Sequence, residues 1–247
     1  MGHLFVVGDI HGCARELEVL LGALPLGPED TIVFVGDYVD RGPASMDVVR
    51  TLLELQRNEK ARTVCLKGNH EDMLLAYMGY PGHHGEAFMY NGGDATLASY
   101  GVSPWLSGSD LANALPADHL GFLCCLEKMY LAPPFLITHA GIDPERSLAD
   151  QREKDLFWIR ERFIEHPHRL PYTVCFGHTA RYEVLIDLPY KIGLDTGCVY
   201  GNRLSCIQLS CTEPKEARLY QIPTGQRRAE TRDLTLDLSA RNIKRDF

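Results

Sequence analysis

The chain has 247 residues, of which 45% are hydrophobic and 23% are charged, and its formal net charge at pH 7 is −8. This composition is typical of a folded globular protein that is long enough to bury a substantial core. The acidic balance argues against a general nucleic-acid binder or a binder of anionic membranes, although bound divalent metals would add local positive charge. No apolar run approaches the roughly 18–20 residues of a membrane span, so we expect no membrane partner.

The cysteine pattern predicts free thiols. The eight cysteines form no Cys-x-x-Cys pair, and several lie inside apolar runs, as buried free thiols do. The N-terminus enters a strand-like run directly, without the layout of a signal peptide. We therefore expect a reduced, cytoplasmic protein.

In the first third of the chain, short apolar runs alternate with amphipathic segments. The alternation is typical of a layered α/β domain, in which strands alternate with helices. The predicted elements, in chain order, are a strand at 4–7, a helix at 14–23, a strand at 31–35, a helix at 45–55, a strand at 63–66 and a helix at 72–77.

The later segments are less regular. We interpret 79–134 as a helical insertion that caps the site. Strands are predicted at 135–138 and 173–176, with an irregular stretch between them, and four further runs predict an antiparallel set of strands. Those runs are 184–187, 191–194, 204–209 and 217–222. The predicted organisation is a single domain over 1–222, followed by a polar C-terminal tail over 223–247.

Five of the apolar runs end in residues that bind metals or phosphate. The central example is the turn Gly36-Asp37-Tyr38-Val39-Asp40-Arg41-Gly42, which leaves the strand at 31–35. Strand ends in open α/β sheets are where binding sites are built. The polar residues at the five ends are Asp9 and His11, then Asp37, Asp40 and Arg41, then Asn69 and His70, then His139, and finally His178.

These residue types favour a pair of metal ions. Carboxylate, imidazole and amide ligands suit Mn²⁺, Fe or Zn²⁺ better than the oxygen cage of Ca²⁺ or a thiolate zinc site. The ligands are too many for one open catalytic ion. Two ions roughly 3.5–4 Å apart, sharing a carboxylate, would use them and could activate water for attack on a phosphoryl group.

The five motifs resemble the signature blocks of the phosphoprotein phosphatase (PPP) family of calcineurin-like metallophosphoesterases. The bacterial and phage branch, which includes lambda phosphatase-like enzymes, is similar in two further segments, Trp158 to Arg162 and Asn91 to Gly93. The block from Leu194 to Cys198 also resembles one found in symmetric diadenosine tetraphosphate hydrolases. The fold that this resemblance implies is α/β: two mixed sheets packed together, helices outside, and a di-metal site at the strand ends.

The resemblance also implies roles for individual residues. Asp37 would bridge the two metals, a bridging hydroxide would be the nucleophile, and no phosphoenzyme would form. His70 would be the general acid, paired to Asp40, and manganese would be the favoured metal, with iron, zinc, cobalt or nickel as alternatives. The implied metal ligands are Asp9, His11, Asp37, Asn69, His139 and His178, and the implied phosphate-binding residues are Arg41, Asn69 and Arg160.

Two substrate classes follow from the resemblance. A phosphorylated protein, in a Ser/Thr phosphatase, is the first reading because Asp40, the His70-Glu71 pair and the Trp158 segment look most like that branch. The alternative is a dinucleoside polyphosphate, cleaved symmetrically to two nucleoside diphosphates. Hydrolases of that type typically have Asp at the position of Glu71 and no acid at that of Asp40. A phosphodiesterase and a non-catalytic phosphate-binding module are weaker alternatives.

Several other residues are assigned ordinary structural roles. Arg162 is an alternative to Arg160 or a surface charge, Trp158 is expected to pack beneath its loop, and Asn91 to Gly93 can be a simple turn. The histidines outside the motifs are predicted to be exposed to solvent: His83, His84, His119, His166 and His168.

Overall fold

The computed structural model describes residues 2–239, and in it two mixed β-sheets pack face to face. In the six-stranded sheet, β1, β2 and β3 are parallel, whereas β9, β10 and β11 run antiparallel. Its spatial order is β11 (Glu230–Thr235), β10 (Glu216–Pro223), β9 (Arg203–Leu209), β1 (Leu4–Val7), β2 (Thr31–Phe34) and β3 (Arg62–Cys65).

The second sheet has five strands. In it β5, β6 and β8 are parallel, and the two edge strands β4 and β7 are antiparallel to their neighbours. Its spatial order is β4 (Met129–Ala132), β5 (Phe135–Thr138), β6 (Thr173–Phe176), β8 (Lys191–Gly193) and β7 (Leu185–Asp187).

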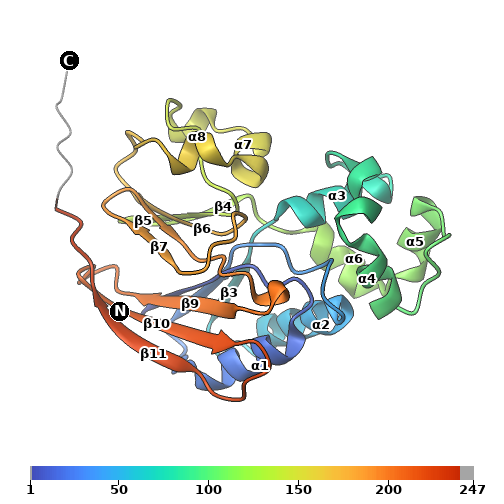
Figure 1. The fold of residues 1–247 in the computed structure, drawn as a ribbon, viewed down its shortest axis with the longest axis horizontal. Helices are drawn as coiled ribbons and strands as arrows, with labels where there is room; N and C mark the ends of the chain where they lie inside the picture. The colour runs from blue at the N-terminus through green and yellow to red at the C-terminus, as the bar shows by residue number, and fades with distance from the viewer. Residues whose placement is uncertain (1, 240–247) are drawn as a thin grey trace.

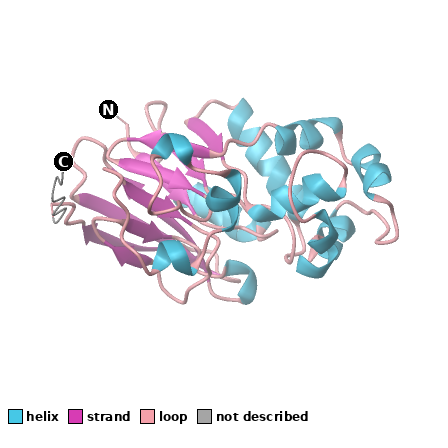
Figure 2. Ribbon diagram, turned by 90° about the horizontal axis from the view of Figure 1, so that it is seen from above, coloured by secondary structure: helices cyan, strands magenta, loops and turns pink. Residues whose placement is uncertain are grey.

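The helices lie outside the two sheets. In Figure 1, α1 and α2 lie beneath the six-stranded sheet, α7 and α8 lie above the five-stranded one, and α3 to α6 gather at one end. Figure 2, seen from above, shows the same helical end beside the strands. Their bounds are α1 (Ala14–Ala23), α2 (Ser45–Arg57), α3 (Asn69–Tyr77), α4 (Gly93–Ser99), α5 (Gly108–Ala114), α6 (Ala117–Cys124), α7 (Glu153–Trp158) and α8 (Glu161–Ile164). Short 3₁₀ helices are η1 (Gly85–Ala87), η2 (Met89–Asn91), η3 (Leu148–Asp150) and η4 (Cys198–Tyr200).

The side-chain alternation of β1 separates two hydrophobic cores. Phe5 and Val7 belong to the core shared with α1 and α2, whereas Leu4 and Val6 belong to the core between the sheets. Successive residues of a strand point to opposite faces, so an uninterrupted apolar run can fill both cores. A third core lies between the five-stranded sheet and α7 and α8. The predicted α/β sandwich of two mixed sheets with helices outside is confirmed.

The C-terminal third differs from the prediction. The four runs predicted as one antiparallel set divide between the sheets: β7 and β8 join one, and β9 and β10 the other, with β8 parallel to β6. Local sequence indicates extended structure but not its pairing partner. Within the segment predicted as a polar tail, β11 pairs antiparallel with β10. The polarity of this segment suits an exposed edge strand, which is why composition suggested a tail. Residues 240–247 lie outside the described residues.

The segment 143–170, predicted as irregular, contains η3, α7 and α8. The insertion at 79–134 is helical up to Cys124 and ends with β4, which pairs with β5. Within residues 2–239, we find no helix that is both long enough and apolar enough to cross a membrane.

Candidate functional site

The loops that leave β1, β2, β5 and β6 and the start of α3 bring the predicted polar residues together. Their backbone is unusual, because five of the seven non-glycine residues with positive φ in the described chain belong to this set. Positive φ costs a residue with a side chain about 1–2 kcal/mol, so such residues concentrate where a function requires them. The five are His11 (φ 45), Asp37 (φ 54), Asp40 (φ 70), Arg41 (φ 69) and His178 (φ 65).

Asp37 lies at the centre of the cluster and is 2% exposed. One carboxylate oxygen is 3.3 Å from His11 Nε2 and the other is 3.4 Å from His139 Nε2. Burial opposes ionisation of this carboxyl, but the neighbouring imidazoles of His139 and His70 and a hydrogen bond with His11 hold its pKa well below the usual value. Asp37 is therefore a carboxylate placed between two imidazoles, as a shared ligand of two cations must be.

Asn69 and two histidines form the second part of the cluster. Asn69 Oδ1 is 3.0 Å from His139 Nε2 and 2.8 Å from His178 Nδ1, and these two nitrogens are 3.2 Å apart. Burial lowers the pKa of His139 to about 4, so its ring is neutral near pH 7. A neutral imidazole is the form that binds a metal.

Hydrogen bonds at the far side of two rings decide which nitrogens face the centre. His11 Nδ1 donates to Val39 O at 2.8 Å, and His139 Nδ1 donates to Val35 O at 3.1 Å. The neutral His139 ring therefore carries its lone pair on Nε2, which faces the Asp37 carboxylate. Backbone carbonyls commonly orient metal-binding histidines in this way. Lone pairs that point toward a carboxylate repel its negative charge when no cation is present. The same arrangement is favourable when a cation lies between them.

The residues fit a metal centre in a second respect. Candidate ligand atoms lie within 4.8 Å of one another in two groups, one with His11, Asp37 and His70 and the other with Asp37, His139 and His178. Asp37 belongs to both groups. In addition, His178 Nε2 is buried and has no hydrogen-bond partner among the described residues. The donor set is the mixed oxygen and nitrogen set expected of Mn²⁺, Fe or Zn²⁺.

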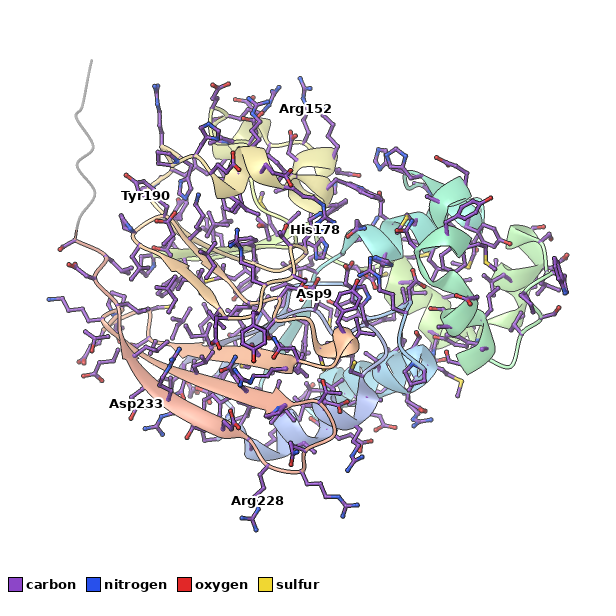
Figure 3. All side chains as sticks on the ribbon, in the orientation of Figure 1. Asp9, Arg152, His178, Tyr190, Arg228 and Asp233 are labelled. Atoms are coloured by element: carbon purple, nitrogen blue, oxygen red, sulfur yellow. The ribbon has the colours of Figure 1, made fainter. Side chains whose placement is uncertain are left out.

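Asp9 lies beside this cluster but belongs to neither group. Both of its carboxylate oxygens accept from the backbone N–H of His178, at 3.1 and 2.9 Å. Asp9 follows β1 of one sheet and His178 follows β6 of the other, and Figure 3 places them close together near the centre of the molecule. Burial, followed by the negative charges of Asp195 and Asp37, raises the pKa of Asp9 well above its usual value. A nearby cation would oppose this effect.

His70 and Asp40 form a buried pair next to the cluster. His70 Nδ1 lies 2.7 Å from Asp40 Oδ2, and the two side chains are 1% and 0% exposed. Thr96 donates its hydroxyl to Asp40 Oδ1 at 2.7 Å and accepts from Asp40 N at 2.8 Å. The carboxylate fixes the imidazole so that Nε2 is the nitrogen left to exchange a proton with a bound molecule.

The predicted arginines flank the cluster. Arg41 Nη1 donates to His11 Nε2 at 2.7 Å, and its guanidinium carbon is 5.7 Å from the ring centroid of Tyr200. Arg160 is exposed, and its Nη1 donates to His178 O at 3.5 Å. Arg162 instead pairs with Asp143 and Glu145 at 3.1 and 2.8 Å. Arg162 is thus engaged on the surface, and Arg160 is the arginine beside the candidate site.

Sequence reasoning missed the part played by Glu71. Its buried carboxylate accepts hydrogen bonds from the backbone N–H groups of Asp37, Tyr38, Val39 and Gly68, at 2.7 to 3.2 Å. Glu71 thereby joins the turn after β2 to the start of α3. The spacing of Gly68 and Glu71 is that of a helix capping box, which could have indicated one of these bonds. Nothing in the local sequence indicated the contact of Thr96 with Asp40, 56 residues away.

Other side chains differ from their predictions. His83, His84 and His166 are exposed as predicted, but His119 and His168 are buried. His119 Nδ1 bonds the hydroxyl of Tyr100, and His168 stacks on Phe163, so tertiary contacts bury rings in polar stretches of sequence. Trp158 is partly buried and donates from Nε1 to Asp72 at 3.3 Å, in agreement with a packing role.

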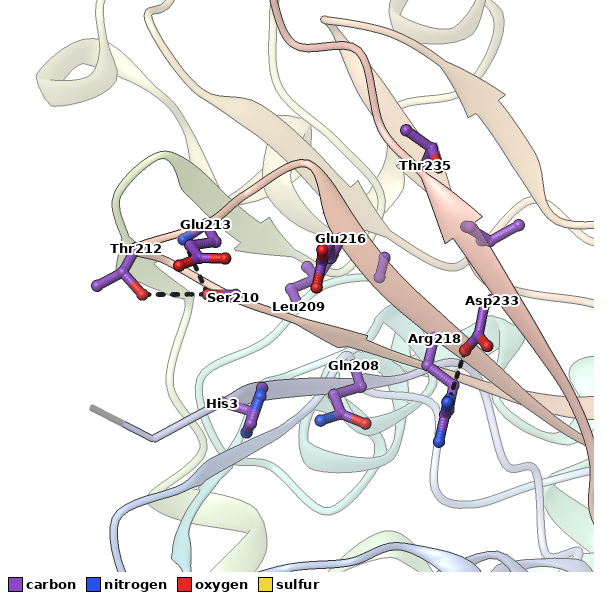
Figure 4. Close-up of a pocket in the computed structure, with 12 residues that line it drawn as sticks. His3, Gln208, Leu209, Ser210, Thr212, Glu213, Glu216, Arg218, Asp233 and Thr235 are labelled. Atoms are coloured by element: carbon purple, nitrogen blue, oxygen red, sulfur yellow. Dashed lines mark hydrogen bonds and ion pairs between the residues drawn. The ribbon is translucent and has the colours of Figure 1, made fainter.

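A pocket of about 700 Å³ lies elsewhere, over β9, β10 and β11 (Figure 4). His3, Gln208, Arg218 and Asp233 are among its lining residues, and none of the predicted site residues lines it. Its chemistry is that of an exposed sheet surface, since Arg218 pairs with Asp233 across the strands. None of its lining residues belongs to the candidate ligand groups around Asp37.

The chain is similar to known proteins along most of its length. The chain is 42% identical to serine/threonine-protein phosphatase 2 of Escherichia coli K12, over 82% of this chain and 91% of that protein. It is 28% identical to the symmetrical bis(5'-nucleosyl)-tetraphosphatase of Vibrio cholerae, over 83% of this chain and 94% of that protein. The crystal structure of a proposed diadenosine tetraphosphatase superposes with a TM-score of 0.66 and 30% identity, over 90% of this chain and 94% of that one.

Residues 2–210 match the family described as calcineurin-like phosphoesterase. The match spans both sheets apart from the strands β10 and β11, and it includes every residue of the candidate site. The family resemblance inferred from the five motifs is confirmed, as is the assignment to a metal-binding hydrolase. The chain belongs to the calcineurin-like phosphoesterase family.

Proposed function

We propose that the chain is a Ser/Thr phosphoprotein phosphatase that uses two divalent metal ions and water. The observation that carries this proposal is the buried His70–Asp40 pair, which lies next to the Asp37 cluster and provides a proton donor for an alkoxide leaving group. The 42% identity to a bacterial serine/threonine-protein phosphatase supports the same substrate class.

The proposed metal ligands are the six predicted residues, with Asp37 shared. When bound, two divalent ions would lower the pKa of water and neutralise charge on the phosphoryl oxygens. We propose manganese for both positions because the donors are carboxylate, amide and imidazole groups. The ligands are Asp9, His11 and Asp37 for one ion, and Asp37, Asn69, His139 and His178 for the other.

The remaining site residues act on the substrate. The planar guanidinium groups of Arg41, beside His11, and Arg160, beside His178, would hold phosphoryl oxygens, which their paired N–H donors match. His70 would give the proton on Nε2 to the leaving oxygen of serine or threonine. Asp40 would accept from Nδ1 and hold the ring in place, and Thr96 would hold Asp40.

The insertion at 79–134 is proposed to cap the site. Gly92 O accepts from Arg41 N at 3.0 Å, and Thr96 reaches Asp40 from α4. Both contacts come from the segment that follows Asn91. Together with β1 to β10, this segment would form the single catalytic domain.

A symmetrical dinucleoside tetraphosphatase is the second candidate. Tyr200 favours it. This residue is 65% exposed and its ring lies beside Arg41, so that a nucleobase could stack on the ring while a phosphate of the same nucleotide meets the guanidinium. The turn that precedes η4, Asp195 to Gly197, lies within the block from Leu194 to Cys198 that resembles symmetrical hydrolases. The Vibrio cholerae relative supports the same alternative.

The test compares kcat/KM of the manganese-loaded protein on a phosphothreonine peptide and on diadenosine tetraphosphate, with the nucleotide products resolved. A higher value for the peptide supports the phosphatase. A higher value for the dinucleotide, with ADP as the only product, refutes that proposal and supports the second candidate. Tyr200→Ala is the matched variant, because it should raise KM for the dinucleotide and leave that for the peptide nearly unchanged.

A further inference from the structure

Three buried side chains outside the proposed catalytic centre bring two thiols and a carboxylate together. Cys13 ends the loop after β1, Glu16 lies on the first turn of α1, and Cys198 begins η4. They are 8%, 7% and 2% exposed. Their ligand atoms, the two Sγ atoms and a carboxylate oxygen, all lie within 4.8 Å of one another. No disulfide joins the two cysteines.

The carboxylate is held in place by a segment distant in sequence. Gly225 N donates to Glu16 Oε1 at 2.9 Å, across 209 residues, from the turn between β10 and β11. The neighbouring Thr224 donates its hydroxyl to Cys198 O at 2.9 Å and lies 3.8 Å from Cys198 Sγ. Three separate parts of the chain therefore fix the cluster, and a backbone N–H orients the carboxylate as such groups do in metal sites.

The spacing fits a tetrahedral cation. Zinc binds thiolate at about 2.3 Å and carboxylate at about 2.0–2.2 Å, which places neighbouring tetrahedral ligands about 3.5–3.8 Å apart. Ligand atoms already within 4.8 Å reach that separation by small side-chain rotations. Two sulfurs and one oxygen leave a fourth position for water.

We propose that Cys13, Glu16 and Cys198 form a binding site for a thiophilic divalent cation such as Zn²⁺ or Cd²⁺. Binding replaces the two thiol protons with two metal–sulfur bonds, and both protons leave to solvent. The ligand set is softer than the oxygen and nitrogen set around Asp37, so the two sites select different metals. The site is separate from the proposed catalytic function and does not depend on it.

Occupation of this site would fix η4 against the loop after β1. Both of these segments also carry residues of the candidate catalytic centre. His11 lies two residues before Cys13 in the loop after β1, and Tyr200 lies two residues after Cys198 in η4. Tyr200 lies over Arg41. A thiophilic ion would therefore restrict the segment that carries an aromatic wall of the candidate active site.

The experiment titrates Cd²⁺ into the manganese-loaded, reduced protein and follows the near-ultraviolet charge-transfer absorption that reports cadmium–thiolate bonds. One equivalent should saturate this band. Cys13→Ser and Cys198→Ser should each reduce its amplitude by about half or more, because one of two thiolates is lost. Glu16→Gln keeps both thiols and should weaken binding by at least about 10–100-fold, which is already the usual cost of losing a residue that only supports a metal ligand.

The matched control is the double variant Cys124→Ser/Cys125→Ser, which removes two exposed thiols and should leave the band intact. A band that disappears in this control but persists in Cys13→Ser and Cys198→Ser would overturn the proposal. So would the absence of any saturable band, or a Cys13–Cys198 disulfide in the untreated protein, identified by peptide mapping of a species whose mass is two hydrogens lower. Circular dichroism identifies variants that do not fold, and Glu16→Gln then provides the decisive comparison.

Discussion

Replacing His70 by asparagine removes the proposed proton donor while keeping a polar side chain at the start of α3. His70 is 1% exposed and its partner Asp40 is fully buried, so bulk water has little access to the position that the ring vacates. A positioned general acid contributes about 10²–10⁴ in rate, which is about 3–5 kcal/mol of transition-state stabilisation. We expect His70→Asn to lower kcat/KM by this factor on a phosphoserine or phosphothreonine peptide, whose alkoxide leaving group needs a proton.

On p-nitrophenyl phosphate the loss should be about tenfold or less, because p-nitrophenolate leaves as a stable anion and gains little from a general acid. The assay measures kcat/KM on both substrates at one pH and one manganese concentration. Asp40→Asn should follow the same pattern with a smaller loss. The double variant should lose little more than His70→Asn, since two residues that act as a unit are not additive.

His83→Asn is the matched control, because His83 also pairs with an aspartate, Asp72, at 2.9 Å but is 47% exposed and has no proposed role in the reaction. It should leave the ratio of the two substrates unchanged. An equal loss on both substrates in His70→Asn would refute the general-acid assignment. An additive double variant would refute the view that Asp40 acts through His70.

Three further predictions concern the metal centre and the fold. Asp37→Asn should lower manganese-dependent kcat by a factor of at least about 10³ and should reduce the amount of bound manganese measured by metal analysis. A variant that still binds two manganese ions per chain would contradict the proposal that Asp37 is a ligand shared by both. Lys191→Met should lower the free energy of unfolding by about 3 kcal/mol or more, because buried Nζ donates to Phe163 O, Ile164 O and His166 O at 2.7 to 2.9 Å. Urea unfolding measures this, with exposed Lys60→Met as a control expected to change little. The metal-free protein should lose stability as the pH falls from about 6.5 toward 4. Burial lowers the pKa of His139 in the folded chain to about 4, so this histidine is protonated first in the unfolded chain. The loss that it causes should reach about 3 kcal/mol in the free energy of unfolding. His139→Gln should remove that part of the slope in urea unfolding, and an unchanged slope would show that other groups cause it.

The sequence was sufficient to predict the strand ends and the residues that gather there. β-Branched apolar runs followed at once by glycine and metal-binding residue types, as at Val35 to Asp37, leave few alternatives. The resemblance to a family then supplied roles for the individual residues. Pairing between strands was harder, since extended runs such as 191–194 and 204–209 look alike and only the three-dimensional structure assigns them to different sheets.

Contacts made over long separations were beyond local reasoning. The bond of Thr96 to Asp40 and those of Glu71 to the turn after β2 depend on how α3 and α4 pack. The burial of His119 and His168 likewise results from rings in other segments. The strand β11 was missed because an exposed edge strand has no apolar face to reveal it.

The positive φ angles of His11, Asp37, Asp40, Arg41 and His178 have a consequence for how this sequence can change. At each of these positions glycine would relieve about 1–2 kcal/mol of backbone strain. A library of variants selected only for thermal resistance should therefore drift toward glycine or asparagine at these positions, and catalysis would disappear while the fold gained tolerance to heat. If related sequences keep histidine, aspartate and arginine at these positions, they have been selected for catalysis and not for stability, and this can be concluded without an activity assay.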